Sequence, residues 1–120
     1  MQLLLVFIGG GLGSLARYGV SLCFGRMGNI YFPLATFISN LLACLIMGVT
    51  LYVFREKISG QAWVGPLLIT GFCGGFSTFS AWSRETLELL QQGAIGWAVA
   101  NILVSLAAGI GILWWLKNIS

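Results

Sequence analysis

Hydrophobic residues along this chain gather into four long runs, separated by short polar segments. A bilayer's hydrocarbon core is crossed by a helix of about 20 mostly apolar residues, and each run is long enough for that. Aromatic residues stand near several run ends, where membrane interfaces collect them. The pattern predicts one all-α membrane domain over 1–120, with transmembrane helices at roughly 3–24, 31–54, 62–83 and 94–116.

The third run contains a segment that does not suit a continuous lipid-embedded helix. Residues 71–80 read GFCGGFSTFS, so two adjacent glycines are followed by Ser, Thr and Ser. Backbone that leaves the helix at membrane depth must be buried in protein or line a polar cavity. The carbonyls freed at such a break can bind a cation, and the freed amides can face an anion. We therefore predict a break in the third helix at mid-membrane, and an ion-handling site there.

Composition narrows the function further. Hydrophobic residues make up 58% of the chain and charged residues only 8%, against about 25% charged in soluble domains. Histidine and aspartate are absent from the sequence, so no nucleophile–base pair is expected, and the chain is predicted not to be an enzyme. Its six basic residues are scattered rather than clustered, which argues against nucleic-acid binding.

Loop charge bears on topology and assembly. Four spans put both termini on one side of the bilayer, together with Arg55, Lys57 and Lys117, while Arg26 and Arg84 fall on the other. This is a weak positive-inside bias, which permits insertion in both orientations. Four helices can hardly enclose a polar pathway alone, so we predict a homodimer.

Polar or small residues recur every four positions on two of the spans: Thr36, Asn40 and Cys44 on the second, and Trp97, Asn101, Ser105 and Gly109 on the fourth. Such stripes can line a pathway, or they can hold helices together through hydrogen bonds worth about 0.6 kcal/mol each. The second interpretation is the simpler one for any single residue. Asn40 taken together with the broken third helix, however, favours a pathway.

Arg17 falls inside the first span, where a charge costs about 2.5 kcal/mol or more. Three interpretations stay open: it faces a water-filled vestibule and attracts anions, it bonds helix-end carbonyls, or it reaches the interface. Gly9 and Gly13, one helical turn apart on the same span, predict close helix packing.

An aromatic stripe follows the third run at Phe72, Phe76, Phe79 and Trp82. Rings at helical spacing usually face the core or the lipid, but their edges carry partial positive charge that can meet an anion. The spans hold Arg, Asn, Ser and Thr but no carboxylate, and this suits an anion better than a cation or a proton.

Three stretches resemble the Fluc/CrcB fluoride channels: GGGLGSLARY at 9–18, Thr36-x-x-x-Asn40-Leu41, and GFCGGFSTFS at 71–80. The resemblance covers almost the whole chain. It implies a passive, selective channel that exports cytoplasmic fluoride across the inner (plasma) membrane, built as an antiparallel dual-topology homodimer with two pores. It also implies a central structural sodium ion, held by the backbone carbonyls of Gly74 and Ser77 from both subunits.

The resemblance further implies roles for single residues. Asn40 matches the pore asparagine, and six others match pore or vestibule positions: Arg17, Thr36, Phe79, Ser80, Trp82 and Ser105. The chain departs from the family at two places, because Trp82 replaces the second pore phenylalanine and Ala81 replaces a threonine. These changes bear on conduction, whereas the fold and the sodium site rest on backbone.

Two other functions are compatible with a small four-span membrane protein. A small multidrug-type transporter also has four spans, but it needs a membrane-embedded acid, and Glu56, Glu85 and Glu88 lie at or beyond the run ends. A non-transporting membrane scaffold would explain the packing glycines, yet it leaves the broken helix, Asn40 and Arg17 without a purpose.

Overall fold

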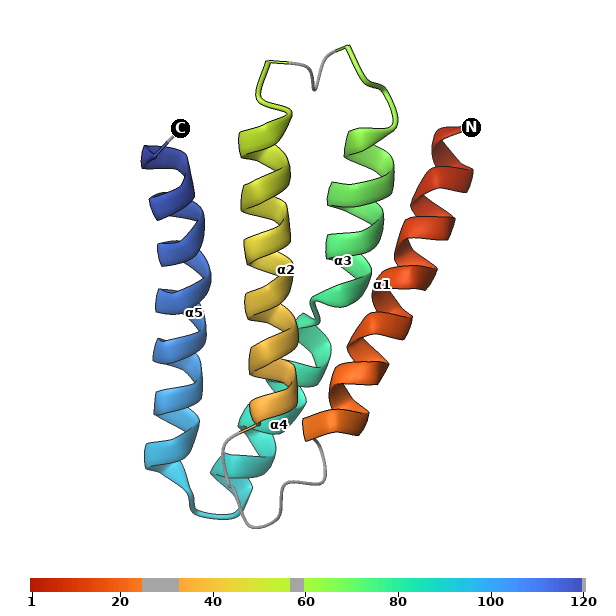
Figure 1. Ribbon diagram of the computed structural model, residues 1–120. Coiled ribbons are helices and arrows are strands. Elements are labelled where there is room, and N and C mark those ends of the chain that lie inside the picture. Colours follow the sequence, from red (N-terminus) through yellow and green to blue (C-terminus); the bar gives the residue numbers. More distant parts are fainter. Residues whose placement is uncertain (25–32, 57–59, 120) are drawn as a thin grey trace.

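The computed structural model describes residues 1–24, 33–56 and 60–119, and over these residues the regular structure is helical. The elements follow in the order α1 (Gln2–Phe24), α2 (Leu34–Val53), η1 (Gly65–Cys73), α3 (Gly74–Phe76), α4 (Phe79–Gln91) and α5 (Ile95–Asn118). Figure 1 shows four helical columns side by side, with η1, α3 and α4 forming the third. This confirms the predicted all-α class and its four columns.

Helices α1, α2 and α5 are each long and apolar enough to cross a membrane. Both chain ends lie at the same end of the molecule, as an even number of crossings requires (Figure 1). The start of the second predicted span, near residue 31, lies outside the described residues, and so do Arg26 and Lys57.

The third column is broken within the predicted segment 71–80, but beyond its glycine pair and not at it. Gly74 keeps helical dihedral angles of φ −64° and ψ −37°. The chain becomes extended two residues beyond the glycine pair, at Ser77 (φ −82°, ψ 155°) and Thr78 (φ −149°, ψ 117°). Helix then resumes at Phe79 and continues past the predicted span end to Gln91.

The glycines serve close packing of α1 against the third column. A Cβ atom on Gly9 would collide with the carbonyl oxygen of Leu67, and one on Gly13 with that of Phe72. A Cβ on Gly75 would likewise meet the backbone of α1. The two helices therefore touch backbone to backbone, which confirms the packing predicted for Gly9 and Gly13 and explains why the third column keeps glycines without breaking at them.

Much of the apolar surface is left on the outside of the chain. Leu3 and Phe7 of α1 are 88% and 77% exposed, and Trp114 of α5 is 67% exposed. Soluble monomers rarely leave so much apolar surface uncovered, so these faces require lipid or another protein chain.

Substitution at Gly13 tests the close approach. Gly13→Val places carbon atoms against the fixed carbonyl of Phe72, so we expect a loss of about 1–3 kcal/mol or more, since such overpacking cannot relax through side-chain movement. Thermal unfolding of the detergent-solubilised protein measures this loss. Gly11→Val is the matched control, because a Cβ there meets nothing within 4 Å. Equal melting temperatures for the two variants would contradict the packing.

Candidate functional site

The break in the third column is held by one side chain from α2. The backbone N–H of Thr78 donates to Oδ1 of Asn40 at 2.7 Å, and Nδ2 of Asn40 donates back to the carbonyl oxygen of Thr78 at 3.4 Å. Asn40 thus pairs both backbone groups of one extended residue, as a neighbouring strand would. We call this pair of hydrogen bonds the Asn40–Thr78 clamp. The clamp gives the N–H and the carbonyl of Thr78 hydrogen-bond partners at the break, where lipid would offer none.

The clamp deprives a helical carbonyl of its usual donor. In an α-helix the N–H of residue i+4 donates to the carbonyl of residue i, so Thr78 would serve Gly74. Its N–H donates to Asn40 instead. The same exchange recurs at the start of α4, where the N–H of Ala81 donates to the hydroxyl of Thr78 at 3.2 Å rather than to the carbonyl of Ser77. Side chains have therefore taken the helical donors of both Gly74 and Ser77.

Gly74 and Ser77 are the two residues that sequence analysis assigned to sodium. Carbonyl oxygens freed from a helix are ligands that suit this ion. Gly74 is exposed, so a second chain can approach its carbonyl. The donor set present at the break therefore fits a sodium ion.

Arg17 also reaches the break. Its Nε donates to the carbonyl oxygen of Gly75 at 3.2 Å, and the residue is half-buried between α1 and the third column. This contact matches the second of the three interpretations for Arg17, a bond to a helix-end carbonyl. A guanidinium carries five N–H donors, so four others are not used by this hydrogen bond.

A small cavity of about 30 Å³ lies beside the clamp, between α2 and α5. It is lined by Phe37, Asn40, Leu41, Cys44, Ser105 and Gly109. Both polar stripes predicted from the sequence thus meet at one place, through Asn40 and Cys44 on α2 and through Ser105 and Gly109 on α5. A volume of this size holds about one or two water-sized occupants.

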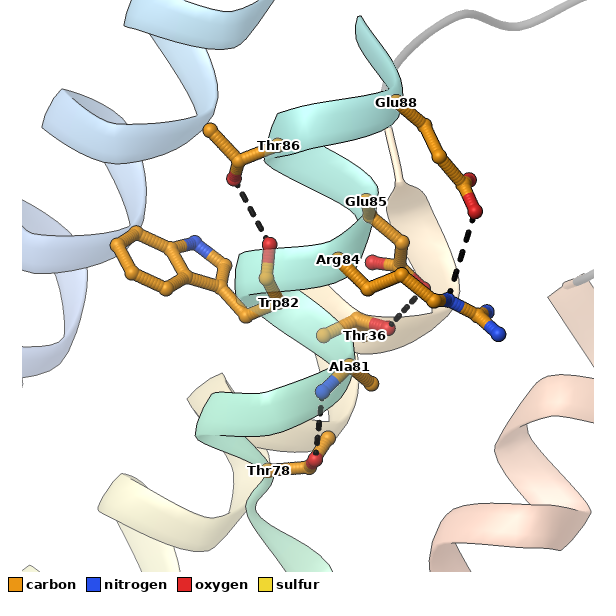
Figure 2. A network of polar contacts seen from close by, with 8 residues as sticks. All are labelled: Thr36, Thr78, Ala81, Trp82, Arg84, Glu85, Thr86 and Glu88. Carbon is orange, nitrogen blue, oxygen red and sulfur yellow. Dashed lines mark hydrogen bonds and ion pairs between the residues drawn. The ribbon is translucent and has the colours of Figure 1, made fainter.

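Hydrogen bonds connect this cavity to α4. Ser105 donates to Oδ1 of Asn101 at 3.2 Å, and Nδ2 of Asn101 donates to the hydroxyl of Thr86 at 2.9 Å. Thr86 in turn donates to the carbonyl of Trp82 at 2.8 Å, as Figure 2 shows. Asn101 is completely buried, so for this residue the interpretation as interhelical hydrogen bonding holds.

The two aromatic residues predicted for the pore lie together at the start of α4. The ring centroids of Phe79 and Trp82 are 5.6 Å apart with planes tilted by 37°. Phe79 is 78% exposed and points away from its own chain. Nε1 of Trp82 is buried and, among the described residues, has no hydrogen-bond partner. Ser80 is exposed next to them, with its hydroxyl 3.3 Å from that of Thr78.

Thr36 stands apart from this group, at the first turn of α2. Its hydroxyl donates to Oε1 of Glu85 at 2.8 Å (Figure 2). Glu85 lies beyond the end of the third apolar run, where a helix continuing into water would expose it. That expectation is wrong for this side chain, which is half-buried against α2, with Oε2 buried and unpaired among the residues that the structure describes. Arg84 and Glu88 do form an exposed surface pair, at 3.5 Å.

The structure adds three residues that sequence reasoning missed as site members. Thr78 carries the clamp, Phe37 lines the cavity, and Glu85 holds Thr36. Thr78 had a usable signal, because threonine is a preferred N-cap residue and its hydroxyl does cap α4. Phe37 and Glu85 had none, since their roles depend on which helices become neighbours.

Three helices able to cross a membrane, an interrupted column between them and a small cavity reached by Asn40 and Ser105 define a small multi-pass membrane protein with a candidate ion site. Comparison with known proteins gives the family. Residues 4–116 match the family described as CrcB-like protein, Camphor Resistance (CrcB), and the chain belongs to it.

Several named relatives are similar over most of their length. A protein of Enterobacter sp. (strain 638) named "Fluoride-specific ion channel FluC" is 47% identical over 107 residues, which cover 88% of this chain and 84% of the relative. The protein of that name from Coxiella burnetii (strain Dugway 5J108-111) is 44% identical over 117 residues, or 95% and 93% of the two chains. One from Serratia proteamaculans (strain 568) is 42% identical over 109 residues, or 91% and 85%.

The clamp can be tested by removing its amide. Asn40→Leu leaves the N–H and carbonyl of Thr78 without their partner, and an unpaired buried backbone group costs about 1–3 kcal/mol. We expect a lower melting temperature in detergent. Asn118→Leu is the control, since Asn118 is an exposed amide at the end of α5. If both variants melt together, the clamp does not stabilise the fold.

Proposed function

We propose that this chain is a passive, selective channel through which fluoride leaves the cytoplasm across the inner membrane. The name of its relatives supports the ion, and the Asn40–Thr78 clamp beside a water-sized cavity is the observation in this chain that carries the proposal. An ion channel carries out no bond chemistry, which agrees with the prediction that the chain is not an enzyme.

The chemistry around the cavity favours a small anion. None of the six described residues that line it is acidic. Asn40 has two amide N–H groups and the clamp uses one, so the second can donate to an ion. Ser105 already donates to Asn101, and its hydroxyl must turn toward the ion to serve it. A few weak donors of this kind bind a dehydrated ion strongly enough to admit it and weakly enough to release it.

Aromatic edges extend the donor set beyond the cavity. Phe79 and Trp82 present adjacent rings at the start of α4, and ring edges carry partial positive charge. Chloride is larger than fluoride and gains less from these contacts than it loses in hydration. The narrow cavity and its weak donors together provide the selectivity for fluoride.

Two features support a homodimer, and the weak positive-inside bias of the loops permits its copies to lie antiparallel. Phe79 projects from its own chain at 78% exposure, so its edge can reach an ion only where another chain forms the far wall. Gly74 is exposed at the break, so an ion bound to its carbonyl needs further ligands from outside the chain. Two breaks facing each other in opposite orientation meet both needs and create two equivalent pores, each with its own Asn40.

The carbonyl oxygens freed at the two breaks would suit a structural sodium ion. Gly74 and Ser77 of each copy would hold it through their carbonyl oxygens, and its charge would join the copies while standing near the anion path. Arg17 adds positive charge on the same side of the break through its contact with Gly75. A mobile anion then experiences fixed positive charge without being bound to it directly.

Flux through reconstituted protein tests the function. Liposomes loaded with potassium fluoride are given a potassium ionophore, and a fluoride electrode follows efflux while chloride-loaded liposomes run in parallel. We expect rapid fluoride loss with chloride retained. Asn40→Ala should slow fluoride at least about tenfold, the effect of losing a hydrogen bond to a charged ligand, while Asn118→Ala conducts normally.

A negative result in this assay has a defined meaning. Trp82→Phe combined with Ala81→Thr restores the residues more usual in the family. If the wild type does not conduct and this variant does, then Trp82 and Ala81 obstruct the pore of the wild type. Equal leakage of chloride and fluoride, or no flux from either protein as an assembled dimer, would overturn the proposal.

The sodium site predicts a stability that depends on the cation. Replacing sodium with N-methyl-D-glucamine should lower the melting temperature of the solubilised dimer, because an ion that binds only the folded state stabilises it by mass action. Asn40→Leu should show a smaller dependence, because without the clamp the break that presents the carbonyls of Gly74 and Ser77 is no longer held in place. Identical wild-type melting in the two salts would rule out a structural sodium.

A further inference from the structure

A second and much larger hollow opens between α2 and α5, at the end of the molecule where both chain termini lie. It has a volume of about 360 Å³, within the usual range for a ligand pocket. Its apolar lining comes from Met47, Leu51, Leu113 and Leu116. Three residues with polar ends complete it, namely Tyr52, Arg55 and Lys117. We call this hollow the α2–α5 groove.

The groove is distinct from the cavity beside Asn40. The two share no lining residue, although both follow the line where α2 and α5 meet. Gly48 keeps these helices close at one point, because a Cβ there would collide with Leu116. The floor of the groove has no amide or hydroxyl donor like those of Asn40 and Ser105, so it suits a hydrocarbon chain better than an anion.

Position along the membrane normal gives the first property of that occupant. Tyr52 is 44% exposed near the end of α2, and Trp114 and Trp115 are 67% and 57% exposed in the last turns of α5. Exposed aromatic side chains at helix ends mark the interface between hydrocarbon and headgroups. The open end of the groove therefore lies at headgroup level, and its floor faces the acyl chains.

Charge gives the second property. Arg55 follows the end of α2, with its guanidinium 5.7 Å from the centroid of the Tyr52 ring, and Lys117 stands in the last turn of α5. Two cations at the mouth of an apolar groove match a phosphate joined to a hydrocarbon chain. Glu56 lies on the other side of Arg55, where it lines a neighbouring hollow with Tyr52 and Val53, so it lessens this attraction.

We propose that the α2–α5 groove binds an anionic phospholipid of the phosphatidylglycerol type. One acyl chain lies along Leu51, Leu113 and Leu116, and the phosphate sits between Arg55 and Lys117. Basic pockets between membrane helices select such lipids over zwitterionic ones, because no headgroup cation opposes the protein's own charge. The site shares no lining residue with the cavity beside Asn40.

Native mass spectrometry of the purified protein tests the site by titration with phosphatidylglycerol and, separately, phosphatidylcholine of the same acyl chains. We expect tighter binding of phosphatidylglycerol. Arg55→Gln and Lys117→Gln should each weaken it about fivefold, the effect of one basic residue near an anionic surface. Arg84→Gln, which removes an exposed cation at the other end of the molecule, is the matched control and should change nothing.

Two further variants separate this site from general surface attraction. Glu56→Gln should tighten phosphatidylglycerol binding, since it removes the carboxylate beside Arg55. Leu113→Trp should fill the groove and lower the affinity for both lipids with no change in charge. An Arg55→Gln, Lys117→Gln double variant that binds phosphatidylglycerol as the wild type does would overturn the proposal. Displacement of the lipid by inorganic phosphate alone would also overturn it, by showing a site for a free anion.

Discussion

The structure depends on one exchange of hydrogen-bond partners within the membrane. Asn40 takes the N–H of Thr78, and the hydroxyl of Thr78 takes the N–H of Ala81, so the helix is interrupted without leaving those amides unpaired. In lipid an interruption with unpaired amides would cost several kcal/mol for each group. The same exchange positions the start of α4, and with it the pair formed by Phe79 and Trp82. Fold and candidate pathway therefore rest on the same two side chains.

Two sets of residues surround this exchange: glycines that allow close packing on one side, and the polar stripes of α2 and α5 on the other. Gly9 and Gly13 let α1 pack directly against the backbone of the third column, because a side chain at either position would not fit. This contact supports the broken segment from one side. From the other side α2 and α5 supply Asn40 and Ser105 to a cavity only large enough for one or two water-sized occupants. The proposed ion path thus has rigid packing against α1 on one side and a small cavity reached by Asn40 and Ser105 on the other.

Much of this was predictable from the sequence, for identifiable reasons. The lengths of the apolar runs predicted helices α1, α2 and α5 closely, because a helix needs a minimum number of apolar residues to cross a bilayer. The break was predicted within 71–80, but not its place at Ser77 and Thr78: adjacent glycines at 74 and 75 suggest an interruption locally, and only the packing of Gly75 against α1 shows why the helix continues past it. Glu85 was misplaced for a related reason, since its burial depends on Thr36, 49 residues away in sequence.

The Asn40–Thr78 clamp also changes where mutations can act on the proposed cation site. A carbonyl belongs to every residue, so replacing Ser77 by another residue removes no ligand, and a survey of acidic or histidine side chains would pass over the site entirely. What distinguishes these two carbonyls is the loss of their helical donors, and that loss depends on Asn40 and Thr78. In genetic terms the site is inherited through residues that do not themselves bind the ion, and selection for the ion would be seen at them.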